Sequence, residues 1–109
     1  MLFRSHGHLV AGHVDGVGSV REISTDVRSM RLILDCPQEL LRYIAVKGSV
    51  AVDGVSLTVN DKTSAGFIVN IIPHTLAQTI MGNYRDKTPV NIEVDIIARH
   101  IESLMSRES

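Results

Sequence analysis

The chain has 109 residues, of which 44% are hydrophobic and 21% are charged, and its formal net charge is −1. This length and composition are typical of a single globular domain. The near-neutral charge argues against a nucleic-acid-binding protein, which usually carries a basic stripe. No apolar run reaches the length of a membrane span and no signal peptide is visible, so we expect a soluble, cytoplasmic protein.

The first half of the chain predicts a succession of short strands. Aromatic residues make up only 4% of the sequence, so the core is expected to consist of Val, Ile and Leu, which favour strands. Residues 1–5 fit no later pattern, and we interpret them as a fragment start that precedes a domain covering residues 6–109. The expected elements are strands at residues 9–14, 17–23, 29–34 and 49–52, and a short helix at residues 38–45. The single cysteine, Cys36, cannot form an internal disulfide and is expected to be a passive structural residue.

The second half continues with strands and turns. Asp53-Gly54 is a turn signal between two apolar runs. The expected elements are strands at residues 55–60, 67–72 and 89–95, a short helix at residues 75–80 and a C-terminal helix at residues 97–105. Five or six short strands with glycine-rich turns predict an all-β fold, a closed antiparallel barrel, because closure removes exposed sheet edges. An open α/β sheet is disfavoured because the helices do not alternate regularly with the strands.

The C-terminal helix carries an apolar stripe. Ile97, Ile101, Leu104 and Met105 share one helical face. This face either packs on a partner subunit or caps its own barrel, and the pattern leaves both alternatives open. We predict a homodimer or a homotrimer.

The histidines and glycines near the start of the chain do not form a recognisable ligand site. His8 and His13 have an odd separation, which places them on opposite faces of a regular strand. No carboxylate stands at ligand spacing beside them, so we do not expect a bound metal. Four glycines between residues 7 and 18 match neither phosphate-binding loop pattern and are interpreted as tight turns and barrel corners.

Ser56 and Thr58 point to the same face of their expected strand, with Leu57 on the other. Two hydroxyl groups in an otherwise apolar strand need partners, because burying them unpaired is costly. They either bond to neighbours inside the protein or face a small molecule with several ring heteroatoms. The pattern favours neither alternative over the other.

Two strand ends are further candidates for a binding site. Pro73 stops the strand that contains Asn70 and Ile72, which leaves backbone groups there for the imide edge of a pteridine or a flavin. The alternative is a plain strand end that leads into a helix. The strand at 89–95 places Asn91, Glu93 and Asp95 on one face, which is usually a solvated face.

Taken together and in order, four stretches of the chain resemble riboflavin synthase: residues 7–16, 47–60, 71–75 and 90–95. The resemblance is to the second of the family's two tandem barrels. It implies a six-stranded, closed, antiparallel Greek-key barrel in a homo-oligomer. The reaction that it implies is the dismutation of two molecules of 6,7-dimethyl-8-ribityllumazine into riboflavin and a pyrimidinedione. That reaction requires no metal or redox cofactor.

The resemblance also implies which residues form the site. Thr58, Ile72 and Thr75 would line the ring pocket, partly through backbone groups. Asn70 would lie near the pyrimidine edge of the ring. Lys47 would lie near the ribityl chain or the pocket rim.

The same resemblance places Ser56, Asp95 and His13 in polar or proton-transfer roles near the reacting carbon, and these three are the candidate catalytic residues. A histidine titrates close to neutral pH, which suits a general acid or base. In the family, the active site lies between the first barrel of one subunit and the second barrel of its neighbour. A single barrel therefore also fits a binding module that holds a flavin or a lumazine without turnover.

Overall fold

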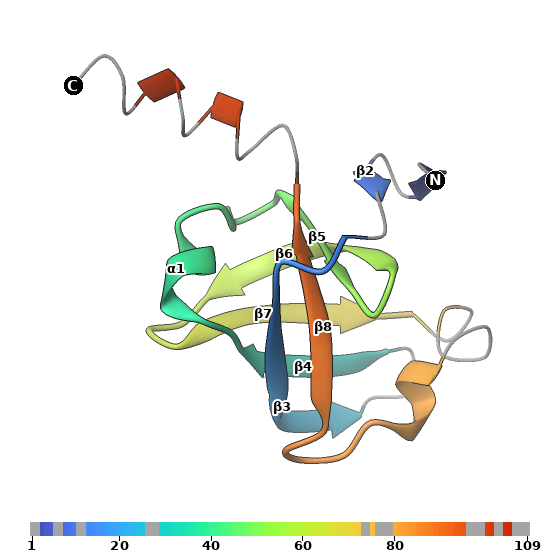
Figure 1. Cartoon of the computed structure of the whole chain (residues 1–109). Helices are drawn as coiled ribbons and strands as arrows, with labels where there is room; N and C mark the ends of the chain where they lie inside the picture. Colours follow the sequence, from blue (N-terminus) through green and yellow to red (C-terminus); the bar gives the residue numbers. More distant parts are fainter. Residues whose placement is uncertain are drawn as a thin grey trace.

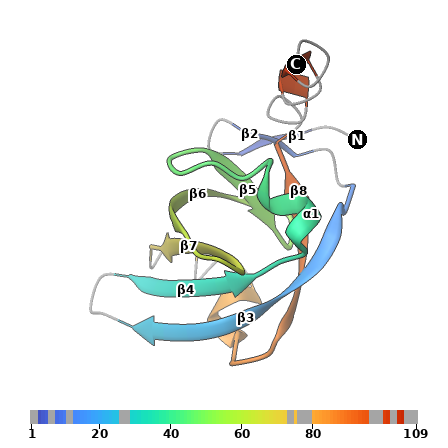
Figure 2. The same cartoon turned by 90° about the vertical axis from the view of Figure 1, so that its left-hand side faces the viewer.

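The computed structural model describes residues 3–5, 8–10, 13–25, 29–72, 75, 80–95, 100, 101, 104 and 105. Within these residues, six antiparallel strands close into a barrel in the order β3-β4-β7-β6-β5-β8 (Figures 1 and 2). The strands are β3 (Gly16–Thr25), β4 (Met30–Asp35), β5 (Ser49–Val52), β6 (Val55–Lys62), β7 (Gly66–Ile71) and β8 (Pro89–Val94). Strands β5, β6 and β7 follow one another as neighbours, and β8 returns beside β5, which is a Greek-key arrangement. The predicted barrel is therefore confirmed.

The core of the barrel follows from the alternation of side chains along each strand. On β4, Met30, Leu32 and Leu34 are buried while Arg31 is exposed. On β8, Val90, Ile92 and Val94 point into the core in the same way. Branched aliphatic side chains therefore fill much of the barrel, as expected.

Gly66 permits the closest contact in the barrel wall. A Cβ atom at this position would lie 1.7 Å from the Leu34 carbonyl oxygen on β4. Any side chain here would push β4 and β7 apart, so the pairing of these strands depends on glycine.

The turn between β5 and β6 has the conformation that Asp-Gly favours. Asp53 and Gly54 have φ values of 48° and 82°, which are those of a type I′ hairpin turn. The Asp53 carboxylate accepts a hydrogen bond from the backbone N–H of Asn91, at 2.8 Å, and another from the Tyr84 hydroxyl. These bonds attach the turn to β8 and to the segment that precedes it.

The start of the chain differs from the prediction. Instead of one strand at residues 9–14, β1 (Phe3–Ser5) and β2 (His8–Val10) form a separate two-stranded sheet, and residues 13–15 are not in a strand. Strand β2 contacts β5 and β6, so this small sheet lies against the outer wall of the barrel (Figure 2). The first barrel strand is β3, which bends at a β-bulge near Val20 and Glu22.

The helix predicted at residues 38–45 is shorter in the structure. α1 (Gln38–Leu41) begins after Pro37, and the Lys62 ammonium donates to the Leu41 carbonyl at 2.8 Å. A 3-10 helix, η1 (Ile80–Asn83), follows a segment in which Thr75 is helical and residues 76–79 lie outside the described part of the chain.

The C-terminal helix is described at residues 100, 101, 104 and 105 only, and Ile97 lies outside the described residues. Ile101, Leu104 and Met105 are 51%, 45% and 64% exposed, so these three side chains do not cap their own barrel. Among the described helices, none has the length and apolar character that a membrane crossing requires.

Candidate functional site

The barrel wall opens between β6 and β7. These strands are paired from Lys62–Phe67 to Val59–Val69, with a β-bulge on the way. Beyond that pair, the rest of β6 is paired with β5, and the rest of β7 is paired with β4. The two strands therefore diverge into a fork.

A cavity of about 210 Å³ lies in this fork. Its walls come from both strands and from the segment that follows β7. The lining residues are Ser56, Leu57, Thr58, Asn60, Asn70, Ile71, Ile72 and Thr75.

The backbone of the fork faces into this gap. The backbone N–H and C=O of Val59 bond to Gly48 and Lys47 on the β5 side. Because successive residues of an antiparallel strand direct these groups to opposite sides, those of Ser56 and Thr58 face β7. By the same alternation, Asn70 and Ile72 face β6. The fork thus presents backbone donors and acceptors from two strands.

The Ser56 hydroxyl is the most unusual group in the site. Ser56 is 1% exposed, and among the described residues its Oγ has no hydrogen-bond partner. A buried hydroxyl without a partner costs about 1–3 kcal/mol. Thr58, on the same face, is exposed, and Leu57 packs in the core on the opposite face. One alternative for these hydroxyls was a hydrogen bond to a neighbour inside the protein. Among the described residues, the Ser56 hydroxyl makes no such bond.

Two cross-strand rows extend from the fork over the outer face of β5 and β8. In the first row, Ser56 is opposite Ala51, and Ala51 is opposite Glu93. In the second row, Thr58 is opposite Ser49. Because Val50 is opposite Val94, the same register places Asp95 opposite Ser49. Asp95 is therefore on the same outer face as Ser56 and Thr58.

The structure brings five of the eight predicted site residues together in the fork cavity: Ser56, Thr58, Asn70, Ile72 and Thr75. Asp95 stands at the far end of the second row. Lys47 is exposed at the entrance to β5 with a left-handed backbone, φ 70°. His13 is exposed in the segment before β3. Neither Lys47 nor His13 lines the fork cavity.

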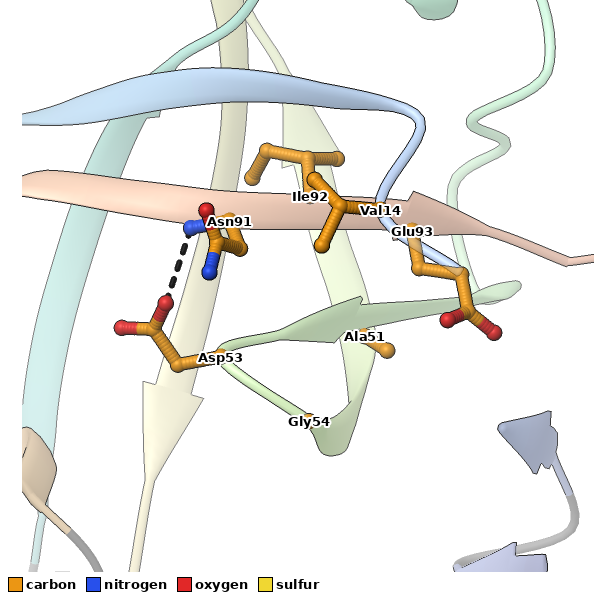
Figure 3. Close-up of a pocket in the computed structure, with 7 residues that line it drawn as sticks. All are labelled: Val14, Ala51, Asp53, Gly54, Asn91, Ile92 and Glu93. Carbon is orange, nitrogen blue, oxygen red and sulfur yellow. Dashed lines mark hydrogen bonds between the residues drawn. The ribbon is translucent and has the colours of Figure 1, made fainter. Parts of the chain in front are cut away.

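A second cavity, of about 340 Å³, lies on the same outer wall over β5 and β8. Figure 3 shows Ala51 between the carboxylates of Asp53 and Glu93, with Val14 nearby and the hydrogen bond from the Asn91 N–H to Asp53 as a dashed line. Glu93 is only 7% exposed, so the prediction that its face is solvated is wrong at this position. Its register partner on β5 is the buried Ala51, and Val14 lines the same cavity, so Glu93 lies among neighbouring residues of the outer wall.

Two titratable groups near the barrel wall have shifted pKa values. Burial raises the pKa of Tyr84 well above its ordinary value, and the hydrogen bond to Asp53 acts in the same direction. Burial also raises the pKa of the Cys36 thiol to about 11. Cys36 is free and buried, in agreement with a passive structural role. In the described part of the chain, no group of three or more His, Cys, Asp or Glu side chains is arranged to hold a metal ion.

Two residues of the two rows, Ser49 and Ala51, were not singled out in the sequence, and Glu93 was assigned to a solvated face. Ser49 and Ala51 stand on the outward positions of β5 and are half-buried and buried. Their alternation with Val50 and Val52 is visible in the sequence and shows that they share a face. Their position opposite Thr58 and Ser56 also follows from a two-residue hairpin turn at Asp53-Gly54.

The fold and the fork cavity, which is lined by polar and apolar residues, define the class of the protein: a small, closed, six-stranded β-barrel with a cavity in its outer wall. Residues 11–95 match the model of the lumazine binding domain, and the chain belongs to this family. The resemblance to riboflavin synthase is confirmed over one barrel. The riboflavin synthase of Photobacterium phosphoreum is 45% identical over 94% of this chain and 47% of the relative. That of Brucella abortus is 45% identical over 90% of this chain and 48% of the relative.

The chain thus spans about half the length of these curated relatives. A solved structure with the same fold is LumP in complex with 6,7-dimethyl-8-(1'-D-ribityl) lumazine, with a TM-score of 0.78. It is 18% identical, and the match covers 84% of this chain and 52% of LumP.

Proposed function

We propose that this barrel binds 6,7-dimethyl-8-ribityllumazine and riboflavin in the fork between β6 and β7. We further propose that it acts as one barrel, the second, of a riboflavin synthase site. The observation that carries the proposal is the Ser56 hydroxyl, which is buried at the cavity without a partner among the described residues. A ring heteroatom of the ligand would supply that partner.

The fork suits the pyrimidine edge of a pteridine or a flavin. That edge alternates carbonyl acceptors with an N–H donor, and the facing backbone groups of Thr58, Asn70 and Ile72 offer the complementary pattern. Ile72, whose side chain is exposed, adds apolar surface for a ring face. Thr75, which is buried, closes the end of the cavity.

The proposed reaction transfers a four-carbon unit between two lumazines and needs no metal or redox cofactor. Much of its rate would come from holding the two rings in a reactive orientation. Ser56 and Asp95 are the proposed polar groups beside the reacting carbon. His13 is the proposed general acid or base, and Lys47 the proposed contact at the rim for the ribityl chain. Because His13 and Lys47 are exposed outside the cavity, their roles require a side-chain movement or a partner barrel.

A second barrel would complete the site, so we propose a homodimer or a homotrimer. The fork cavity of about 210 Å³ is smaller than the roughly 300–1,000 Å³ of sites that enclose a small ligand. A bound ring would keep one face open for a second ring held by a neighbour. The exposed Ile101, Leu104 and Met105 are the candidate contact surface. Light scattering should report an oligomer, and a monomer at high protein concentration would contradict this part of the proposal.

A second candidate function is binding without turnover. It is favoured by the fork cavity, whose lining residues all belong to this one barrel. The solved relative LumP is described in complexes with a lumazine, with riboflavin and with flavin mononucleotide.

Incubation with 6,7-dimethyl-8-ribityllumazine separates the two functions. Riboflavin absorbance that rises in proportion to protein concentration, and that falls with Asp95→Asn, supports the synthase. Saturable binding with no riboflavin over a long incubation supports the binding module. The absence of binding of either ligand at high micromolar concentrations would contradict both.

A further inference from the structure

Asn60 lies at the apex of the fork, on a β-bulge. The last pair between β6 and β7 is Val59–Val69, and the register shifts between Val59 and Asp61, so Asn60 is the additional residue on β6. Bulges are frequent next to functional sites, where they redirect a side chain. Asn60 is exposed and lines the fork cavity, whereas Val59 before it is buried in the core. The Asn60 side chain is therefore on the outer face, at the end of the cavity where the two strands meet.

Asn70 stands on the other side of the apex. It follows Val69 on β7 as Asn60 follows Val59 on β6, and it lines the same cavity from an exposed position. Within the described part of the chain, no hydrogen bond uses either side-chain amide. Two carboxamides thus border the apex, with donors and acceptors that are open to a ligand.

The apex offers a ring different groups from those in the open part of the fork. In the open part, backbone groups of Thr58 and Ile72 face the gap. From Val59–Val69 onward, β6 and β7 pair with each other, so a ring carbonyl at the apex has fewer backbone donors within reach. A carbonyl oxygen accepts two hydrogen bonds, and the Asn60 side chain carries an NH₂ donor at this point.

We infer that the Asn60 amide donates a hydrogen bond to a carbonyl group of the bound ring at the apex of the fork. This inference rests on the proposed ring site. Asn60 is then a further ligand-binding residue, which the resemblance to riboflavin synthase did not indicate. Its contact fixes the depth to which the ring enters the fork.

The test is a fluorescence titration with riboflavin at about pH 8 and about pH 4, on either side of neutrality and close to the ordinary pKa of an aspartate. Asn60→Ala should weaken binding about 5- to 10-fold at both pH values, as expected for one hydrogen bond. Asn60→Asp has nearly the same shape, but at the higher pH its carboxylate only accepts hydrogen bonds. Because this carboxylate would face a ring carbonyl, binding should weaken about 10- to 100-fold.

Acid should restore riboflavin binding by Asn60→Asp. A facing carbonyl favours the protonated carboxyl group, which donates a hydrogen bond as the amide does. The affinity of Asn60→Asp should therefore rise toward that of the wild type at the lower pH, while the affinities of Asn60→Ala and the wild type change little. The charged neighbours, Asp61 and Lys62 on β6 and Arg31 opposite Asn70 on β4, are shared by all variants. An effect that stems from them would appear in every titration.

Asn83→Asp is the matched control. It adds the same charge at an exposed position in η1, outside both cavities, and should bind riboflavin like the wild type at both pH values. An unchanged affinity of Asn60→Ala, or an Asn60→Asp protein that stays equally weak in acid, would overturn the inference. The same loss in Asn83→Asp would also overturn it, because net charge alone would then explain the result. If the wild type does not bind riboflavin, the proposed function itself fails, which is a different outcome.

Discussion

Replacing Ser56 with alanine is expected to stabilise the fold and weaken ligand binding at the same time. The Ser56 Oγ is buried without a partner among the described residues, and such a hydroxyl costs about 1–3 kcal/mol. Alanine removes this cost and leaves a space the size of one oxygen atom. The free energy of unfolding should therefore rise by about 1 kcal/mol, and Tm by about 4–8 °C for a domain of this size.

The same substitution removes a hydrogen bond to the bound ring. The affinity for riboflavin should fall about 5- to 10-fold, since a net hydrogen bond contributes about 1 kcal/mol. Urea unfolding without ligand measures the first effect, and a fluorescence titration with riboflavin measures the second. Ser24→Ala, at an exposed position on β3, should change neither quantity. A Ser56→Ala protein that is less stable, with unchanged affinity, would refute the reasoning, because the hydroxyl would then serve the fold.

Three other predictions concern the barrel itself. Gly66→Ala should lower the free energy of unfolding by about 3 kcal/mol or more in urea, because its Cβ would overlap the Leu34 carbonyl; a loss below 1 kcal/mol would contradict the close approach. Tyr84→Phe should cost about 1–3 kcal/mol at pH 8, since it removes the Tyr84 hydroxyl that donates to Asp53 Oδ2 and leaves the carboxylate with the Asn91 N–H on its other oxygen. The pKa of Tyr84 is raised by folding, so its contribution is complete below the unfolded pKa of about 10 and is lost as the pH rises above it; a difference from Tyr84→Phe that does not shrink above pH 10 would contradict this. The Cys36 thiol, with its pKa raised to about 11, should react with a thiol reagent at pH 8 far more slowly in the folded protein than in urea, and equal rates would show that it is not buried.

Local patterns in the sequence were sufficient for most of the barrel. Alternating apolar residues on β4 and β8 predicted strands, and Asp53-Gly54 predicted the hairpin that sets Ser56 opposite Ala51. Each of these signals depends only on residues that are close together in the sequence, so the sequence alone is enough to detect it. The resemblance to riboflavin synthase added the strand count and most of the residues that line the fork.

The fork and the buried Glu93 could not be predicted in this way. The fork exists because β6 and β7 diverge beyond the pair Val59–Val69. Where two strands stop pairing depends on residues far apart in the sequence, and the alternation within each strand does not indicate it. Glu93 belongs to an alternating strand that is typical of a solvated face. In the structure it lies beside Ala51, its register partner on β5, and Val14 from the segment before β3 lines the same cavity. These neighbours are distant in the sequence, so the local alternation could not predict them.

The most direct test of the ring site is a titration of isotope-labelled protein with riboflavin, followed by the NMR signals of the backbone amides. The largest shifts are expected on the fork, at Ser56, Thr58, Asn70 and Ile72, and they should saturate together. Shifts confined to the opposite wall, on β3 and β4, or no shifts at high micromolar riboflavin, would contradict the claim that the fork binds a flavin or a lumazine.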